Sequence, residues 1–195
     1  MTRARRHRLV VFVTIASLAG CGSPNPVLYT IAPVSGPQHA AAPRVILLQQ
    51  LGLERYLERS QIVRSSENYK LDVMANDWWG EPLGAMLSRV LVSELEQRLP
   101  QSTVISEVGA VSAPADATVA LNVLRLDEDA SGSVILQAQA GVSFKGKSGQ
   151  ALQSFRFSVP PPSPDMPGEV AAISAAVGQL ADGLASMLVA HPPSR

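Results

Sequence analysis

The sequence predicts an α/β domain in which two long helices pack on a mixed, mainly antiparallel sheet of about six strands. Two stretches, from Pro82 to Leu99 and from Gly168 to about Ala190, repeat apolar residues every three or four positions, so each predicts a helix with one buried face. About six shorter runs are alternating or wholly apolar, as strands are. The two helices lie too far apart for regular strand–helix alternation, so we expect a mixed sheet rather than a parallel one.

Most of the expected strands lie between the two helices. The six expected strands span residues 45–48 and 69–73, before the first helix, and residues 103–107, 118–126, 134–144 and 152–159, after it. The last two are joined by a Lys-Gly-Lys-Ser-Gly turn and predict an antiparallel hairpin. The segment from Leu53 to Val63 fits either a helix or a strand. Pro82 suits a first helical turn, Pro100 ends the first helix, and five prolines within residues 160–167 separate the hairpin from the second helix.

Cys21 is the only cysteine and closes the sequence Leu-Ala-Gly-Cys at the end of a short apolar run. Four arginines precede this run, which extends without charge from Leu9 to Ala19. As a helix it spans only about 16 Å, against about 30 Å for a hydrocarbon core, so it predicts a signal peptide rather than a membrane anchor. We expect cleavage between Gly20 and Cys21 and lipidation of the Cys21 thiol. An ordinary secretory signal with a chance cysteine is the alternative. Gly22, where an aspartate would favour inner-membrane retention, favours the outer membrane.

Removal of the first 20 of the 195 residues leaves 175, which is the size of one domain. This mature chain has 12 basic and 16 acidic residues, so its charge of −4 argues against a general affinity for nucleic acid. We expect a lipidated, proline-rich tether over residues 21–43. A short edge strand at Leu28 to Ile31 would leave only Gly22 to about Val27 freely mobile. The domain is expected over residues 44–190 and a tail over 191–195.

The sequence offers little for catalysis, cofactors or metals. Residues 141–148 match the phosphate-loop pattern G-x-x-x-x-G-K-[ST], but they lie in an alternating strand followed by Gly149, so a hairpin turn is predicted. His39 and His191 lie far from any carboxylate cluster, and no hydrolase or zinc motif occurs. Residues 127–129 are all acidic and precede a small polar stretch, which predicts a solvated turn rather than a calcium loop. We therefore expect no enzyme, no cofactor and no metal site.

Both tryptophans precede the first helix. Trp79 is expected to seal the core, because large aromatic side chains are mostly buried. Glu81 or Asp77 is expected to accept from free N–H groups at the helix start. Trp78 cannot easily face the same way in an extended segment, so it is a candidate contact for a partner or for lipid.

Several residues before and within the first helix resemble a known family. They are Leu53, Tyr56-Leu57, Arg59, Gln61-Ile62-Val63, Asn68, Leu71, Trp79-Gly80-Glu81-Pro82-Leu83 and Arg89-Val90-Leu91. This pattern is similar to that of the auxiliary lipoproteins of ABC-type transport systems, the PqiC type. The likeness covers residues 28–99 well and the remainder only in strand order and in the alanine-rich final helix. Ser60 stands where a proline is usual, and Gly80 where alanine is common.

The resemblance implies a periplasmic α/β domain anchored in the outer membrane through acyl chains and working beside MCE-domain proteins that carry lipid. It further implies a ring of identical subunits, no catalytic residue, and a structural motif at Trp79, Glu81 and Pro82. Tyr56, Arg59 and Gln61 would shape either a subunit contact or the fold, and an ion pair of Arg59 with Glu58 or Glu54 is the plainer alternative. A stand-alone periplasmic lipid- or ligand-binding lipoprotein, with a pocket between sheet and helices, remains a second hypothesis, and an envelope hydrolase a third.

Overall fold

The larger of two sheets is the mixed sheet that the sequence predicts. The computed structural model describes residues 25–40, 42–67 and 69–190. The strands of this sheet follow the order β6-β2-β7-β8-β9, and β3 also pairs with β7. Their bounds are β2 Val45–Leu48, β3 Gly52–Leu53, β6 Thr103–Ser106, β7 Ala117–Glu128, β8 Val134–Phe144 and β9 Ala151–Val159. β2 runs parallel to β6 and β7, and β3 runs parallel to β7. β8 is antiparallel to both of its neighbours, β7 and β9.

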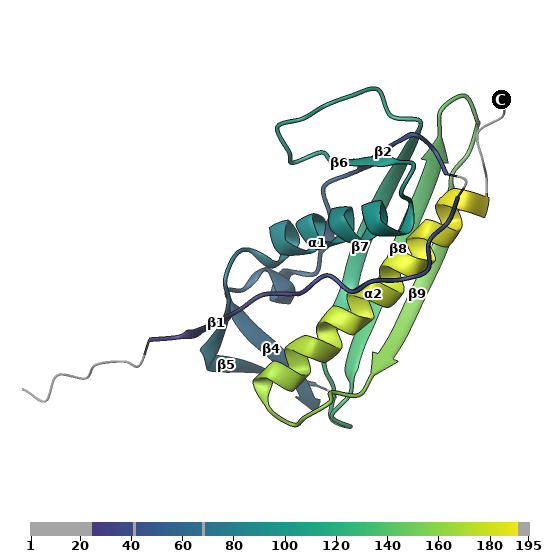
Figure 1. Ribbon diagram of the computed structural model, residues 1–195. Coiled ribbons are helices and arrows are strands. Elements are labelled where there is room, and N and C mark those ends of the chain that lie inside the picture. The colour runs from purple at the N-terminus through teal and green to yellow at the C-terminus, as the bar shows by residue number, and fades with distance from the viewer. Residues whose placement is uncertain (1–24, 41, 68, 191–195) are drawn as a thin grey trace, which may run out of the picture.

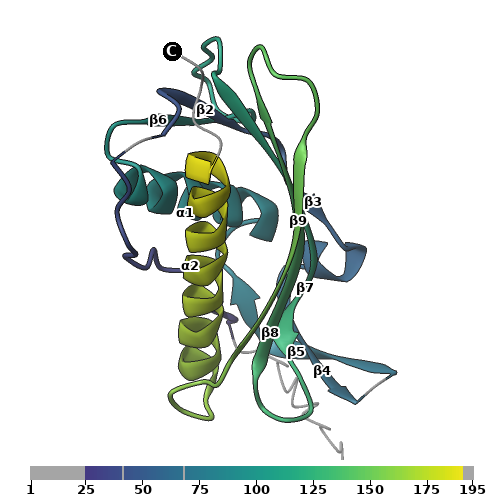
Figure 2. The same cartoon turned by 90° about the vertical axis from the view of Figure 1, so that its right-hand side faces the viewer.

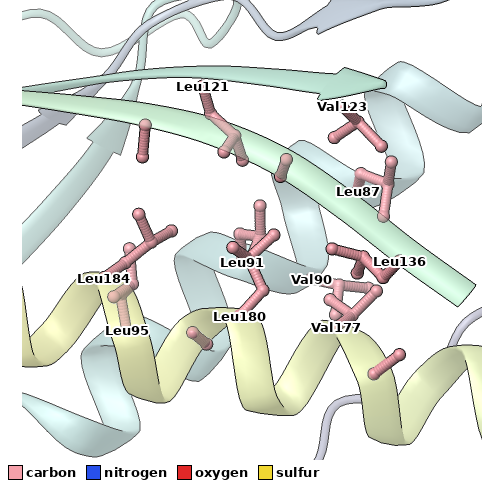
Figure 3. Packing of buried hydrophobic residues seen from close by; sticks show 14 of the residues in the cluster. Leu87, Val90, Leu91, Leu95, Leu121, Val123, Leu136, Val177, Leu180 and Leu184 are labelled. Carbon is pink, nitrogen blue, oxygen red and sulfur yellow. The ribbon is translucent and has the colours of Figure 1, made fainter. Parts of the chain in front are cut away.

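Two helices cover one face of this sheet, and the opposite face is open over part of its length (Figures 1 and 2). They are α1, Leu83–Arg98, and α2, Met166–Ala190. The apolar stripes of both helices meet the inward side chains of β7 and β8 in one core (Figure 3). By length and composition α2 could cross a membrane, but 67% of its most apolar window is buried inside the fold. Packing in the core accounts for its hydropathy.

A second, three-stranded sheet lies where the described chain begins (Figure 1). It follows the order β1-β5-β4, with β1 Val27–Tyr29 parallel to β5 Lys70–Trp79, and β4 Gln61–Glu67 antiparallel to β5. The sequence does not predict this sheet as a separate unit. The ambiguous segment after Leu53 forms a short 3-10 helix, η1 Arg55–Glu58, and then β4. The strand expected over residues 69–73 continues to Trp79 through a polar stretch that hides its periodicity.

Residues 31–39, which we call the strap, connect β1 to β2 and pack along both helices. Ile31 is only 1% exposed, and its N–H lies 3.2 Å from the sulfur of Met86 in α1. The Ala32 N–H donates to the hydroxyl of Ser174 in α2 at 3.2 Å. Prolines exclude a helix or a central strand here, as predicted, but they do not keep the segment away from the body. The packed body thus includes the strap, which lies before the expected domain start at residue 44, and the expected tail lies outside the described residues.

Candidate anchoring and interaction site

Two polar side chains and one backbone carbonyl in the last turns of α1 hold the strap through its backbone. Glu94 accepts from the Val34 N–H at 2.7 Å. Gln97 accepts from the Gly36 N–H at 2.9 Å and donates to the Gly36 carbonyl at 3.2 Å. The Arg98 carbonyl accepts from the His39 N–H at 2.8 Å. A proline-rich segment cannot join a regular strand ladder, so these side chains satisfy the backbone groups that a sheet would otherwise pair.

Arg98 joins the strap to both helices from inside the protein. Its side chain is 1% exposed, and its Nε donates to Asp182 Oδ1 of α2 at 2.5 Å. The two terminal nitrogens donate to the carbonyls of Val34, Glu94 and Gly178 at 2.9, 3.2 and 3.0 Å. A planar guanidinium suits such a convergence because its donors point outward in a fixed geometry. We call Glu94, Gln97, Arg98 and Asp182 the strap clamp.

The strap passes close to the strap clamp at Gly36. A Cβ built on Gly36 would lie 2.3 Å from the Asp182 carboxylate and 2.4 Å from the Arg98 guanidinium. A side chain at position 36 would therefore have to displace the Arg98–Asp182 ion pair.

Glu94 is a buried carboxyl with one oxygen, Oε2, that has no partner among the described residues. The pKa of Glu94 is raised to about 7, mainly by burial and to a smaller extent by the nearby Asp182, while the Val34 N–H and Arg98 oppose this shift. Because the folded chain holds the proton more tightly than the unfolded chain, this group favours folding below about pH 4.5. That contribution is lost as the pH rises towards 7.

The substitution Glu94→Gln should remove this pH dependence. The amide keeps an oxygen for the Val34 N–H but never ionises, so the stability of the variant relative to the wild type should rise between pH 4.5 and 7. By linkage the change is at most about 3 kcal/mol. Urea unfolding at several pH values measures it. Glu96→Gln, at an exposed position of the same helix, is the control and should follow the wild-type profile. Parallel profiles for Glu94→Gln and the wild type would contradict the prediction.

A row of three side chains crosses the small sheet next to the beginning of the described chain. The register pairs Leu28 of β1 with Trp78 of β5, and Trp78 with Gln61 of β4. Leu28 is 62% exposed, while Trp78 and Gln61 are half-buried. The Trp78 indole N–H donates to the Ala75 carbonyl at 3.0 Å. The predicted contact residues Gln61 and Trp78 are thus neighbours, although they lie 17 positions apart in the sequence.

Arg59 and Tyr56, the other predicted contact residues, have different environments. Arg59 is exposed just before β4, and no ion pair to Glu58 or Glu54 occurs within the described part of the chain. The Tyr56 hydroxyl instead donates to Asp127 at 2.7 Å, and burial together with this hydrogen bond raises the pKa of Tyr56. Arg125 grips the other oxygen of Asp127 at 2.8 and 3.0 Å. These contacts tie Tyr56 to β7.

Asp127 corrects the expectation of a solvated acidic turn over residues 127–129. It is 1% exposed and lies within β7, where Tyr56 and Arg125 satisfy its charge. Asp129 does form the expected turn, since it accepts from Ser131 and Ser133. No cluster of three metal-ligating side chains occurs among the residues that the structure describes.

Trp79 is buried at 7% exposure and seals the core as predicted, but Glu81 does not cap the first helix. Glu81 forms an ion pair with Arg89 at 2.5 Å, and no side chain accepts from the start of α1. Pro82 occupies the N-cap position, and its carbonyl accepts from the Met86 N–H. The capping prediction was therefore wrong, because the helix that begins after Pro82 directs Glu81 to the arginine two turns further on.

A second buried ion pair links the small sheet to α2 and was missed from the sequence. Arg64 of β4 donates to Glu169 at 2.6 Å, and Glu169 is fully buried in the first turn of α2. Burial raises the pKa of Glu169, and Arg64 opposes this shift. Nearby, Asp165 accepts from the Gly168 N–H at 3.0 Å. An aspartate just before a predicted helix is a capping pattern, so this contact could have been found from the sequence.

Several hollows lie on the surface of the described part of the protein, and one of about 450 Å³ beside Tyr56, Arg125 and Asp127 is lined by polar and charged side chains. One of about 480 Å³ lies on the open face of the larger sheet and is lined mainly by uncharged amides and small residues, including Asn122, Gln139 and Gln150. Another, of about 380 Å³, is mostly apolar and lies at the start of α1 beside Leu53 and Val108. The phosphate-loop pattern forms the predicted hairpin turn between β8 and β9.

Comparisons with known proteins agree with this architecture. Residues 27–185 match the family model described as ABC-type transport auxiliary lipoprotein component. Protein XCC0632 from Xanthomonas campestris, a DUF330 protein, is 18% identical with a TM-score of 0.71, over 84% of this chain and 95% of its own. A second crystal structure, of an uncharacterized protein, is 16% identical with a TM-score of 0.71, over 84% and 98% of the two chains. The search of curated proteins gives no match.

The architecture defines a class of α/β domain in which a helix pair packs on a mixed sheet and a strap leads into it from the N-terminal side. The chain belongs to the family of ABC-type transport auxiliary lipoprotein components, because the family model covers most of its length. This family is a transport component and not a known enzyme family, and its members are described as lipoproteins. The predicted lipidation site, Cys21, and the cleavage position after Gly20 lie outside the described residues.

Proposed function

We propose that this protein is an accessory subunit of an MCE/ABC-type lipid transport system, anchored in the outer membrane at its periplasmic face through acyl chains on Cys21. It docks the transporter to the outer membrane and thereby supports membrane integrity, without a catalytic step or a cofactor. Family membership, carried by the match over residues 27–185, is the observation on which the proposal rests.

The strap clamp supports an anchoring role. Seven hydrogen bonds join residues 31–39 to α1 and α2, and the segment is thereby fixed to the core rather than hinged to it. Only three residues separate Cys21 from Asn25, where the described chain begins. An extended chain covers at most about 3.6 Å per residue, so Cys21 and Asn25 lie within about 14 Å of each other. A lipid on Cys21 would hold the folded body close to the bilayer.

Arg59 and Gln61 are the residues that we assign to a contact with the transporter or with a neighbouring subunit. Arg59 is exposed and has no ion pair within the described residues, and arginine is enriched at protein interfaces. A closed ring of identical subunits needs two different patches on each copy. The surface around Arg59 is proposed as one of them.

The second candidate function is that of a stand-alone periplasmic lipoprotein that binds lipid or another ligand. The surface hollows of about 480, 450 and 380 Å³ favour it, since all three are of the size of ligand sites. The pocket that the sequence places between sheet and helices receives less support. Side chains from both helices and from β7 and β8 fill that region, as Figure 3 shows.

Purification of the lipidated protein from its host in a mild detergent tests the proposal. Mass spectrometry should identify an MCE-domain protein, and particle images should show rings. Arg59→Glu should weaken co-purification at least several-fold, whereas Arg55→Glu, an exposed arginine of the neighbouring η1, should not. A monomer that carries lipid and retains no MCE-domain protein would favour the second candidate.

A further inference from the structure

We propose that the β1 edge and Trp78 form a membrane-contact surface, in which Val27, Leu28 and the Trp78 indole lie in the interfacial layer of a phospholipid bilayer. The inference rests on the proposed lipidation of Cys21, and it adds a second point of contact to the acyl anchor.

Chain length places this edge within reach of the bilayer. Leu28 is seven residues from Cys21, so their Cα atoms lie within about 25 Å even when the chain is fully extended. The strap clamp prevents β1 from swinging away, because the strap continues directly from β1 into the groove of the two helices. Figure 1 shows β1 at the end of the molecule where the described chain begins. Any bilayer that holds Cys21 therefore meets this end of the protein first.

Two neighbouring apolar side chains are exposed to water at this edge, although the register places Asp77 beside Val27. Val27 and Leu28 are 52% and 62% exposed, and Leu28 neighbours Trp78 across the β1–β5 pair. Tryptophan prefers the membrane–water interface, where its ring contacts apolar groups while its N–H stays polar. Here the indole N–H already has the Ala75 carbonyl as acceptor, so it can enter that layer without losing a hydrogen bond. The mature chain is acidic, so apolar contact rather than charge has to favour binding of the β1 edge to the bilayer.

Fluorescence quenching tests the proposal, because the chain has only two tryptophans. The mature chain is coupled through Cys21, its only thiol, to a maleimide phospholipid in phosphatidylcholine vesicles that contain lipids brominated near the headgroup. Trp79→Phe leaves Trp78 as the reporter, and Trp78→Phe leaves the buried Trp79. We expect at least twofold stronger quenching for Trp78 than for Trp79. Leu28→Asp in the Trp78-only chain should remove at least half of that quenching.

Leu152→Asp is the matched control, since Leu152 is 75% exposed on β9 of the other sheet and should leave the quenching unchanged. Equal quenching of the two tryptophans, or no effect of Leu28→Asp, overturns the proposal. Either outcome would indicate that a protein partner rather than lipid covers the β1 edge. If Trp79→Phe does not fold, hydrogen exchange of the coupled wild-type chain decides. Amides of residues 27–29 should exchange at least threefold more slowly on vesicles than in solution, and an unchanged rate overturns the proposal.

The proposed function fails by a different measurement. Mass spectrometry of the protein from its host shows whether Cys21 carries acyl chains. A bare thiol in the host with strong Trp78 quenching on the coupled chain would refute the anchoring and leave the contact surface standing. A lipidated Cys21 with unquenched Trp78 would support the anchoring and refute the contact surface.

Discussion

Replacing Arg98 with methionine is expected to destabilise the fold, because it removes several buried hydrogen bonds, at about 1–3 kcal/mol for each buried carbonyl left without a donor, and an ion pair of which only the Arg98 side is buried. Methionine fills a similar volume but donates nothing. The carbonyls of Val34 and Gly178 would lose their donor, and the Asp182 carboxylate its counter-charge. Chemical denaturation monitored by circular dichroism measures the loss.

Arg89→Met provides the matched control for Arg98→Met. Arg89 belongs to the same helix and also pairs with a carboxylate, that of Glu81, but both side chains are substantially exposed. Exposed pairs contribute at most about 1 kcal/mol, so this variant should remain close to the wild type. A similar small loss for both substitutions would show that the strap clamp does not stabilise the fold. Limited proteolysis should also cut the strap of the Arg98→Met variant first.

Replacing Cys21 with serine is expected to abolish membrane association and envelope function while leaving the domain folded. A serine hydroxyl does not take the diacylglyceryl group, and the signal peptide is too short to span a bilayer. The protein should move from the membrane fraction to the soluble periplasmic or unprocessed pool, which fractionation and immunoblotting measure. Its circular dichroism spectrum and unfolding midpoint should match those of the soluble wild-type domain, because Cys21 lies outside the described fold.

Ser23→Ala is the control for Cys21→Ser, since it alters the same short segment without the thiol and should stay membrane-bound. Continued membrane partitioning of Cys21→Ser, after removal of the signal peptide, would contradict the tether prediction. The edge contact proposed for Leu28 and Trp78 is not expected to retain the protein alone, because two or three exposed apolar side chains bury far less apolar surface than an acyl chain.

Regular elements with a single buried face could be predicted from the sequence. β8 begins and ends at the residues expected, and α1 lies within one residue of its predicted bounds at each end. Periodicity suffices there because each element contacts one core through one stripe or face. The small sheet was not predicted as a unit, since the short, exposed β1 pairs with a strand about fifty residues later. Local patterns do not specify such a pairing.

In the candidate site, too, single residues could be predicted from local patterns but their long-range contacts could not. Gln61, Trp78 and Arg59 were singled out from the sequence, but only the strand register brings Gln61 beside Trp78. Tyr56 was assigned to either a contact or the fold, and its hydrogen bond to Asp127, 71 positions away in the sequence, could not be foreseen from a local pattern. The strap clamp was missed entirely. A glutamate and an arginine on a helix look solvated in sequence, and the strap that buries them has no periodicity that would reveal its path.

The strap clamp also determines how the protein responds to mechanical load. Tension applied at the lipid end would run through β1 and the strap to Glu94, Gln97 and Arg98, and then into the helices that fill the core. Such a load would act on several hydrogen bonds between the strap and the helices at the same time instead of breaking them one after another. The body would then follow its anchor as one rigid piece, and a transporter gripping the far surface would experience lateral drift of the lipid as displacement of the whole domain.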